Sequence, residues 1–479
     1  MKAILIFLLS LLSFKNSSAQ KQPTFSKSQM FADFDTLVAT ISRVSPQLRV
    51  KEDLWHYDFL STAKLLRTKI DTISNDLSYY ILLLSVLNAA QDLHTSDWRE
   101  QTGWAKQQED AYLRIRNGKF KVAIPHTVYA GKYFVTFPFT LNNDTISIGT
   151  EITKINGQEI NMYLEENPWV RSGFSYNFGK NSFSCIGFHK NLQSIFKDSL
   201  QLSFLNDKKA EVTYTIDVTK PIKYLPENLS VDSTRVEFWS NFNTLYIRLT
   251  EMNEEYKNYL RKTILQYSSR LDQHSKIIID IRNNGGGNDN VWTDLYADLI
   301  DKPIYYSLEL AVTDYTSQQK EFIKKRSKAT GKLVEKYNLY TIVNKKYSIW
   351  PSQSSIHFKG KIYVVAESVY SSAGSALSVA NANKEDNLVS VGRLSGQFLG
   401  IGMAPLVFEL PNTKFKYRIA PSIEITNIQK ASDLMQDKVE IPVPFDISYY
   451  QQRFTSNISI TSEEFLTKHD PFIKRVLVL

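Results

Sequence analysis

The strongest constraint on the fold is a short apolar run, residues 276–281, that passes directly into the glycine-rich segment 282–288. A continuous apolar run of this length indicates a strand buried on both faces of a sheet. A second such run, 361–366, leads into Tyr370-Ser-Ser-Ala-Gly374 and then an apolar helix to about residue 382. This alternation predicts a parallel or mixed sheet, with loops at the carboxyl ends of its strands, where functional sites collect.

The hydrophobic period divides the rest of the chain. Apolar residues recur every three or four positions from residue 28 to about 95, which predicts a small helical domain. From about Tyr112 the period is two, which predicts short strands with turns at Asn117-Gly118 and Ala130-Gly131. The expected division is a signal peptide over 1–19, a helical domain over 20–105, a β-rich domain over 106–225, and an α/β core over 226–479 with a Lys-rich insertion near 314–346 that includes an exposed helix.

The first twenty residues have the pattern of a secretory signal. A basic start at Lys2 is followed by an apolar run over 3–14 and by small residues at Ser17 and Ala19. The run is shorter than the roughly 18 to 20 residues that span a bilayer. Cleavage near Ala19 is therefore favoured, with a retained N-terminal anchor as the alternative. We expect an exported chain, periplasmic or extracellular, without a stable membrane span after cleavage.

The single cysteine and the net charge bear on which classes of function are possible. Cys185 is the only cysteine, so an exported chain has no internal disulfide and depends on packed cores. Its apolar neighbours favour buried packing over a nucleophilic role. The net charge of +8 is modest for 479 residues, and no nucleic-acid motif accompanies it. No nucleic-acid partner is expected.

Ser372 is the best candidate nucleophile. It lies just beyond a buried strand and opens a predicted helix, where its hydroxyl and the next amide point the same way. Glycines in a neighbouring loop allow a second N–H to come close, and two such donors form an oxyanion hole. Among seven histidines, His94 stands out at a domain junction, two residues from Asp92. Each residue alone would more often be structural, as a packing histidine and a helix N-cap.

Several segments, in consistent order over about residues 30–479, resemble the C-terminal-processing and tricorn-core serine peptidases. The segment 277–287 is similar to their Asp-Leu-Arg-x-Asn-x-Gly-Gly signature, and 365–374 is similar to their Thr/Tyr-x-Ser-Ala nucleophile segment. Asp92-Leu-His-Thr95 resembles the Asp-x-His-Thr element of the tricorn-like branch. Two further segments, 391–396 and 468–477, resemble the Gly-x-x-Thr-x-Gly strand and the terminal Lys-Asp-Pro-x-Leu helix.

The segment Ile148–Ile160 is a separate resemblance. It is similar to the Gly-Asp-x-Ile-x-x-Ile-Asn-Gly segment of PDZ domains, with Thr150 at the usual acidic position. The segment has an apolar strand, an Asn156-Gly157 turn and then a polar stretch that could begin a helix, a pattern that fits a strand–turn–helix unit. An ordinary hairpin is the alternative. A PDZ-like region would bind peptides by strand addition.

The family resemblance implies an α+β multidomain fold: an N-terminal helical domain, a PDZ-like β-rich domain, and a ClpP/crotonase-like α/β catalytic core with a mixed sheet. It also implies a serine endopeptidase that acts on peptide or unfolded protein through an acyl-enzyme, without a metal or organic cofactor. Ser372 would attack the amide carbonyl and His94 would be the base. The amides of Gly286 and Ala373 would bind the oxyanion.

The choice of base rests on Gln397, which follows Gly396 where the Ser/Lys branch of the family has its lysine. The Ser/His branch is therefore favoured, although Leu93 replaces its usual supporting serine. Asp92 is one possible orienting group for His94, and Glu424 and Glu440 are candidates by position. Two alternatives stay open: a catalytically inactive peptide- or ligand-binding protein on the same scaffold, and an esterase.

Overall fold

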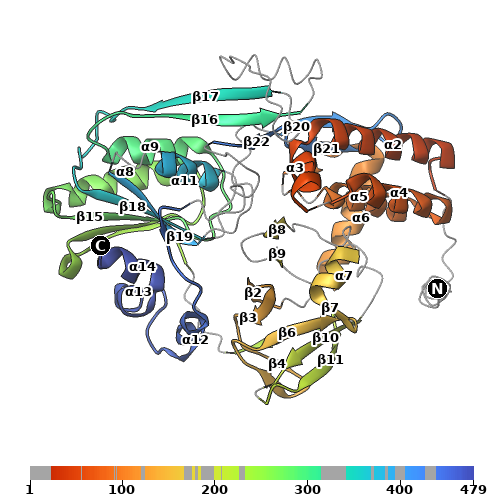
Figure 1. Ribbon diagram of the computed structural model, residues 1–479, viewed down its shortest axis with the longest axis horizontal. Helices are drawn as coiled ribbons and strands as arrows, with labels where there is room; N and C mark the ends of the chain where they lie inside the picture. The colour runs from red at the N-terminus through yellow and green to blue at the C-terminus, as the bar shows by residue number, and fades with distance from the viewer. Residues whose placement is uncertain are drawn as a thin grey trace.

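The computed structural model forms a helical region, a β-rich region and an α/β region around a common centre (Figure 1). This arrangement confirms the predicted α+β architecture. The structure describes residues 23–479 apart from 56, 91, 93, 120–123, 167–174, 178–181, 185–198, 207, 226–231, 314–340, 368–371, 383–386, 394–404 and 427–438. The predicted signal peptide, Cys185, Leu93 and Gln397 therefore lie outside the described residues. No helix within these ranges is long and apolar enough to cross a membrane.

The helical region confirms the periodicity of the N-terminal sequence. Ser26 caps its first helix through a capping box with Gln29, and Asn75 caps the most buried helix. That helix is apolar on all sides, as a helix enclosed by others must be. The elements are α2 (Lys27–Val44), α3 (Pro46–Trp55), α4 (Phe59–Arg67), η1 (Thr68–Thr72), α5 (Asp76–Ala89) and α6 (Gly103–Lys119).

Helix α6 corrects one sequence prediction. Strands were expected from about Tyr112, with a turn at Asn117-Gly118, but the chain is helical to Lys119. Ala105 and Tyr112 lie on the same face of the helix, about two turns apart, and are both buried in the helical core. Burial of this face outweighs the local turn preference of Asn-Gly, because tertiary packing overrides a weak local propensity.

The β-rich region contains a six-stranded sheet in which β11-β10-β6-β3-β2 are neighbours and β7 pairs with β6. Asn156 and Gly157 have φ values of 51° and 83°, so the predicted turn is present. It closes a short antiparallel hairpin of β6 and β7, the alternative to a plain strand, turn and helix, and β7 leads directly into helix α7. The elements are β2 (His126–Tyr129), β3 (Lys132–Val135), β4 (Phe139–Leu141), β5 (Asp144–Ile146), β6 (Glu151–Ile155), β7 (Gln158–Glu159), α7 (Ile160–Glu166), β8 (Ser175–Asn177), β9 (Ser182–Ser184), β10 (Ser199–Leu205), β11 (Glu211–Asp217) and β12 (Lys223–Tyr224).

The α/β region is built on a six-stranded mixed sheet of order β13-β14-β15-β18-β19-β23, in which only the first pair is antiparallel. Ile277 and Ile279 pack on one face and Ile278 on the other, which explains the unbroken apolar run. The strands are β13 (Arg235–Trp239), β14 (Thr244–Arg248), β15 (Lys276–Asp280), β18 (Lys361–Glu367), β19 (Leu388–Arg393) and β23 (Ile441–Pro442).

Helices cover both faces of this sheet (Figure 1). The first face carries α8 (Tyr256–Tyr267), α9 (Asp289–Leu299) and α11 (Ser372–Ala382), and the second carries α13 (Glu463–His469) and α14 (Pro471–Leu477). Short elements complete the region: η4 (Ser240–Phe242), η5 (Ser268–Arg270) and α12 (Ile447–Thr455). The layered arrangement agrees with the alternation of strands and helices in the sequence.

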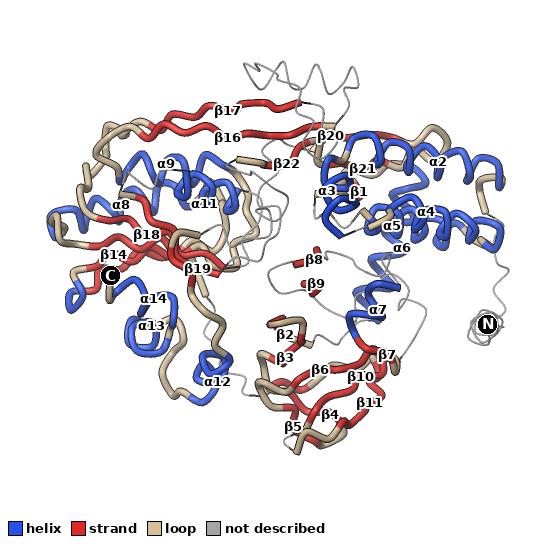
Figure 2. Tube along the Cα trace, in the orientation of Figure 1, coloured by secondary structure: helices blue, strands red, loops and turns tan. Residues whose placement is uncertain are grey.

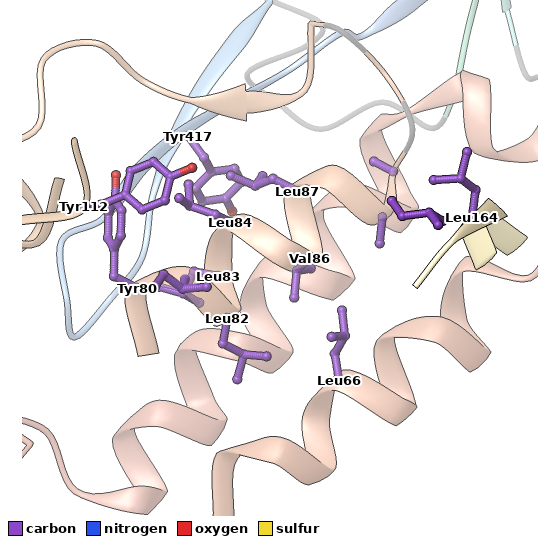
Figure 3. Packing of buried hydrophobic residues seen from close by; sticks show 14 of the residues in the cluster. Leu66, Tyr80, Leu82, Leu83, Leu84, Val86, Leu87, Tyr112, Leu164 and Tyr417 are labelled. Atoms are coloured by element: carbon purple, nitrogen blue, oxygen red, sulfur yellow. The ribbon is translucent and has the colours of Figure 1, made fainter. Parts of the chain in front are cut away.

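Strands from the C-terminal half also reach the helical region. β21 (Lys416–Ile419) pairs with β1 (Ser96–Asp97) and with β20 (Leu406–Glu409). Tyr417 of β21 lies among Leu84, Leu87 and Tyr112 of the helical core (Figure 3). Buried Asp33 of α2 accepts hydrogen bonds from the Asn412 and Thr413 amides at 2.9 and 2.8 Å, which fixes the turn of this hairpin.

A second connection is the sheet of β16 (Ile304–Val312), β17 (Thr341–Ile349) and β22 (Ser422–Glu424), which extends from the α/β region toward the helical one (Figure 1). Thr313, just after β16, donates to the Arg43 and Val44 carbonyl oxygens at the end of α2. The last residues of the Lys-rich insertion belong to β17, and residues 314–340 lie outside the described ranges.

Candidate active site

Ser372 is the first residue of α11, and the preceding strand β18 ends at Glu367. The predicted setting of the nucleophile, a helix that begins after a buried parallel strand, is therefore present. The amide of Ala373 is in the first helical turn, where backbone N–H groups have no acceptor within the helix. Tyr296 of α9 donates from its buried hydroxyl to the Ala376 carbonyl oxygen at 3.0 Å, which holds α11 against α9.

The glycine-rich loop follows β15 on the neighbouring strand. Asn284, which is fully buried, donates from Nδ2 to the Leu249 carbonyl oxygen at 2.9 Å. Its Oδ1 accepts a hydrogen bond from the Gly286 amide at 2.8 Å. The Asn284 side chain thus fixes the loop to β14, and the amide predicted to bind the oxyanion already has a partner.

Gly287 explains why the loop ends in glycine. A Cβ at this position would lie 2.3 Å from the Met252 carbonyl oxygen, and the backbone has a φ of 144°. The Met252 amide donates to the Gly286 carbonyl oxygen, and the Asn288 amide donates to the Met252 carbonyl oxygen. Only glycine permits this close approach of two backbone segments.

The Asp280 and Arg282 side chains of the same motif are buried and do not open toward solvent. Arg282 donates from Nη2 to Asp280 Oδ2 at 2.6 Å and from Nη1 to Asp470 Oδ2 at 2.7 Å. Asp470 also caps α14 by accepting from the Phe472 and Ile473 amides. The charged side chains of this signature motif therefore attach the terminal helix to the carboxyl edge of the sheet.

Asp280 is ionised in this network. Burial alone would raise the pKa of its carboxyl, but Arg282 and Arg248 more than offset that effect and hold the pKa well below its usual range. Tyr246 donates a further hydrogen bond to Asp280 Oδ2 at 2.9 Å. A buried carboxylate with two arginines and a tyrosine has its hydrogen-bonding capacity filled, so its role here is structural.

His94 lies just after α5, beside a buried carboxylate. Asp92 Oδ1 accepts from the His94 amide at 3.0 Å, and Oδ2 accepts from Thr95 Oγ1 at 2.7 Å. The His94 ring atom Nδ1 is 4.0 Å from Asp92 Oδ1. Burial lowers the pKa of His94, Asp92 opposes this shift, and the nearby Arg418 guanidinium adds to it. The ring is therefore mainly neutral near pH 7, as a general base requires.

The two predicted catalytic residues belong to different regions. His94 directly precedes β1 in the helical region, whereas α11 is in the α/β region (Figure 2). The Ser372 side chain is outside the described part, so no separation is defined between its Oγ and the His94 ring. Arg418 of β21 pairs opposite Ser96, and its Nε donates to Ser96 Oγ at 2.9 Å. The hairpin from the C-terminal half therefore supplies a guanidinium whose charge lowers the pKa of His94.

The two glutamates that were candidates to support the base differ in their surroundings. Glu424 is buried in β22, opposite Leu310 of β16. β22 contacts α3 of the helical region, and β16 contacts α11. Glu440 is exposed, and its amide donates to Ser390 Oγ at 2.8 Å. Of the two, only Glu424 lies in a sheet that touches both regions.

A metal site does not emerge from the side chains that the structure describes, because they include no group of three or more His, Cys, Asp or Glu residues able to hold an ion. The candidate reactive groups are the predicted Ser372 hydroxyl, the His94 imidazole and the backbone amides of Ala373 and Gly286. This set can perform acyl transfer, in which an oxyanion is stabilised by N–H donors.

Comparison with known proteins agrees with this geometry. Residues 243–425 match the model of Peptidase family S41 and include both strand–loop junctions. Curated protein sequences contain no match. Mature CPAF complexed with lactacystin has 12% identity and a TM-score of 0.55, over 94% of this chain and 99% of that chain. A mutant of CPAF has 13% identity and a TM-score of 0.56, over 94% and 98%.

These two similarities establish a shared fold. The photosystem II D1 C-terminal processing protease aligns at 12% identity over 90% of this chain and 98% of that chain, but its TM-score of 0.43 is too low to add to that conclusion. The family match covers the strand–loop junctions that carry the candidate chemistry. Residues 243–425 of this chain are therefore similar to peptidase family S41, which supports a serine-type peptidase, and the chain shares the fold of CPAF.

Proposed function

We propose that this chain is an exported endopeptidase that cleaves peptide bonds through an acyl-enzyme on Ser372. The observation that carries the proposal is the start of α11 at Ser372, shortly after the buried strand β18, whose parallel neighbour β15 leads into the glycine-rich loop. Ser372 Oγ attacks the carbonyl carbon while His94 accepts the hydroxyl proton. His94 then returns that proton to the leaving amine, and water hydrolyses the ester in a second cycle of the same steps.

The oxyanion hole is proposed to use the amides of Ala373 and Gly286. The Ala373 amide lies in the first turn of α11, where backbone N–H groups have no acceptor within the helix. The Gly286 amide donates to the neutral Asn284 side chain in the free protein. A developing oxyanion is a stronger acceptor than a neutral amide oxygen, so it can replace Asn284 as the Gly286 acceptor.

The proposal for His94 rests on its neutral ring and on the carboxylate beside it. Asp92 is placed to orient the imidazole, because it accepts hydrogen bonds from the His94 amide and from the Thr95 hydroxyl of the same turn. We propose Glu424 rather than Glu440 as a further supporting carboxylate, since β22 lies in the sheet between the two regions. Approach of His94 to Ser372 depends on how the helical region meets α11.

The proposed substrates are peptides or unfolded protein segments. The β-rich region contains the strand, turn and helix that resemble a PDZ domain, and its sheet ends at β2 and β11. An extended peptide can pair with such an edge strand through main-chain hydrogen bonds, which tolerate varied side chains. Export through the N-terminal signal pattern would bring this activity outside the cytoplasm.

Active-site labelling tests the nucleophile. A fluorophosphonate probe should label the wild-type chain, should fail to label Ser372→Ala, and should still label Ser371→Ala, the matched control one residue away. Equal labelling of Ser372→Ala would overturn the assignment. Cleavage of unfolded casein that is lost in both Ser372→Ala and His94→Ala would exclude a purely peptide-binding function on this scaffold. An unaffected His94→Ala would assign the base to another residue.

A further inference from the structure

A cavity of about 290 Å³ lies where the β-rich region, the edge of the main sheet and α12 meet. Phe137 of the β-rich region packs on Phe454 of α12 at a ring separation of 4.5 Å, so these elements are in contact beside it. The cavity does not include Ser372 or His94. Its walls combine Thr127 and Thr136 of the β-rich region, Tyr450 and Arg453 of α12, and several charged side chains of the α/β region.

Most charges in this wall are already neutralised by one another. Arg248 pairs with Asp232 at 2.6 Å, and Arg282 pairs with Asp280 at 2.6 Å. Arg235 donates to Asp232, Glu237 and the Thr461 carbonyl oxygen. Glu367 pairs with Arg393. These groups therefore offer little binding capacity to a ligand.

Arg453 is the exception among the charged groups of the wall. It projects from the last turn of α12, and no described side chain or carbonyl group forms a hydrogen bond or ion pair with its guanidinium. Its Nε is buried without a partner, although the ring of Tyr449 lies 5.8 Å away. A buried guanidinium donor without an acceptor is costly, so an acceptor is expected at this place.

Neutral donors surround the same space. The hydroxyls of Thr127, Thr136 and Tyr450 line the cavity, and within the described part of the chain none of them forms a side-chain hydrogen bond. Burial lowers the pKa of His126 to about 4, so this ring adds no charge near pH 7. The cavity therefore combines one unpaired positive charge with three unused hydroxyls.

We propose that this cavity binds the carboxylate group of a small ligand, with the Arg453 guanidinium as its principal donor. A guanidinium fork matches the two oxygens of a carboxylate, and adjacent hydroxyls can donate to the same oxygens. The volume equals that of roughly ten water molecules, which limits the ligand to an organic acid of a few carbons or the last residues of a peptide. This binding is separate from the acyl-transfer chemistry.

The position of the cavity gives the binding a structural consequence. Thr127 and Thr136 belong to the β-rich region, Arg453 belongs to α12, and Glu367 ends the strand that leads to Ser372. A carboxylate held between these walls links the β-rich region to the α/β region. The bound ligand therefore stabilises the folded chain and fixes the relative placement of the two regions.

Binding of succinate to the full-length chain tests the proposal, with sodium chloride adjusted to keep ionic strength constant. Succinate should raise the Tm of the wild-type chain in a saturable manner. Arg453→Gln should weaken the binding roughly ten- to hundred-fold, because a charge-assisted hydrogen bond is lost. Arg475→Gln, an exposed arginine on α14, is the matched control and should bind as the wild type does. Thr127→Val provides a second, milder variant should Arg453→Gln fold poorly.

A short peptide with a free C-terminus, compared with its C-terminal amide, identifies the source of the carboxylate. Saturable binding of succinate would identify the ligand as a free organic acid. Binding of only the free-acid peptide would identify it as the C-terminus of a chain. Either result supports the proposal if Arg453→Gln weakens the binding. Equal binding by Arg453→Gln would overturn it. Binding of inorganic phosphate without any carboxylate probe, or no binding of any probe, would also overturn it. Fluorophosphonate labelling of Ser372 is expected to persist in every variant, which separates this test from that of the nucleophile.

Discussion

Arg282 Nη1 donates to Asp470 Oδ2 at 2.7 Å, joining two residues that are 188 positions apart in the sequence. Arg282 belongs to the loop after β15, and Asp470 caps the terminal helix. Both side chains are buried. One ion pair therefore fixes the end of the chain to the strand edge from which the glycine-rich loop begins.

Replacement of Asp470 by Asn should destabilise the fold by about 3 kcal/mol, because it leaves a buried arginine without one carboxylate partner. Asn retains a side-chain oxygen that can cap α14, so this change removes the charge of the carboxylate and keeps the helix cap. Asp470→Ala should cost about 1 kcal/mol more, through loss of the cap. Urea denaturation measures both changes. Equal stability of Asp470→Asn and wild type would show that the pair contributes nothing.

The pH dependence of peptidase activity should report His94. Its pKa is lowered from 6.5, so the base stays unprotonated and active as the pH falls to 6.5, and activity declines only below that value. Arg418→Gln removes a positive charge and should move the acidic limb to higher pH, whereas Asp92→Asn should move it to lower pH. The measurement is kcat/KM against pH for a fluorogenic peptide.

Ser96→Ala is the control for Arg418→Gln, because it removes the Arg418 hydrogen bond and leaves the charge in place. In Ser96→Ala, the pH at which kcat/KM declines on the acidic side should stay at the wild-type value. Shifts of the same sign in Arg418→Gln and Asp92→Asn would contradict the assignment of the limb to His94. The same lowered pKa makes stability depend on pH. Below pH 6.5 His94 is protonated more fully in the unfolded chain than in the folded chain, so the free energy of unfolding falls as the pH falls.

Two neighbouring glycines should respond differently to alanine. Gly287→Ala places a Cβ 2.3 Å from the Met252 carbonyl oxygen at a φ of 144°, and should cost about 2 kcal/mol or more. A Cβ at Gly285 meets nothing within 4 Å, so Gly285→Ala should change stability by less than about 0.5 kcal/mol. Thermal denaturation compares them. A loss of similar size in both variants would refute the steric account.

Tyr296→Phe tests the attachment of α11 to α9. The change removes one buried hydrogen bond, from the Tyr296 hydroxyl to the Ala376 carbonyl oxygen, and should destabilise the fold by about 1 kcal/mol. Because α11 begins at Ser372, the same change should lower kcat more than it alters KM. Tyr256→Phe, at an exposed hydroxyl that donates to Glu251, is the matched control and should leave both parameters unchanged. Identical behaviour of the two variants would contradict this role for Tyr296.

The local sequence predicted the central strands and the start of α11 correctly. The residues of β15 and β18 are apolar on both faces. Of the two helices that follow these strands, α9 and α11, only α11 begins with a serine. The Asn156-Gly157 turn was also predicted, since its positive φ values favour those residue types. Helix α6 was predicted wrongly, because the buried face of Ala105 and Tyr112 outweighed the nearby Asn-Gly signal.

The sequence by itself determined the strands, the glycine-rich loop and the helix that opens at Ser372, because these depend on the period and backbone freedom of adjacent residues. Tertiary structure alone decided three other features. It brought Arg418 beside His94, joined the Asn284 side chain to the Leu249 carbonyl oxygen, and joined Arg282 to Asp470. Each of these joins a residue to a partner chosen by burial and charge once the chain is folded, and no local pattern specifies that partner.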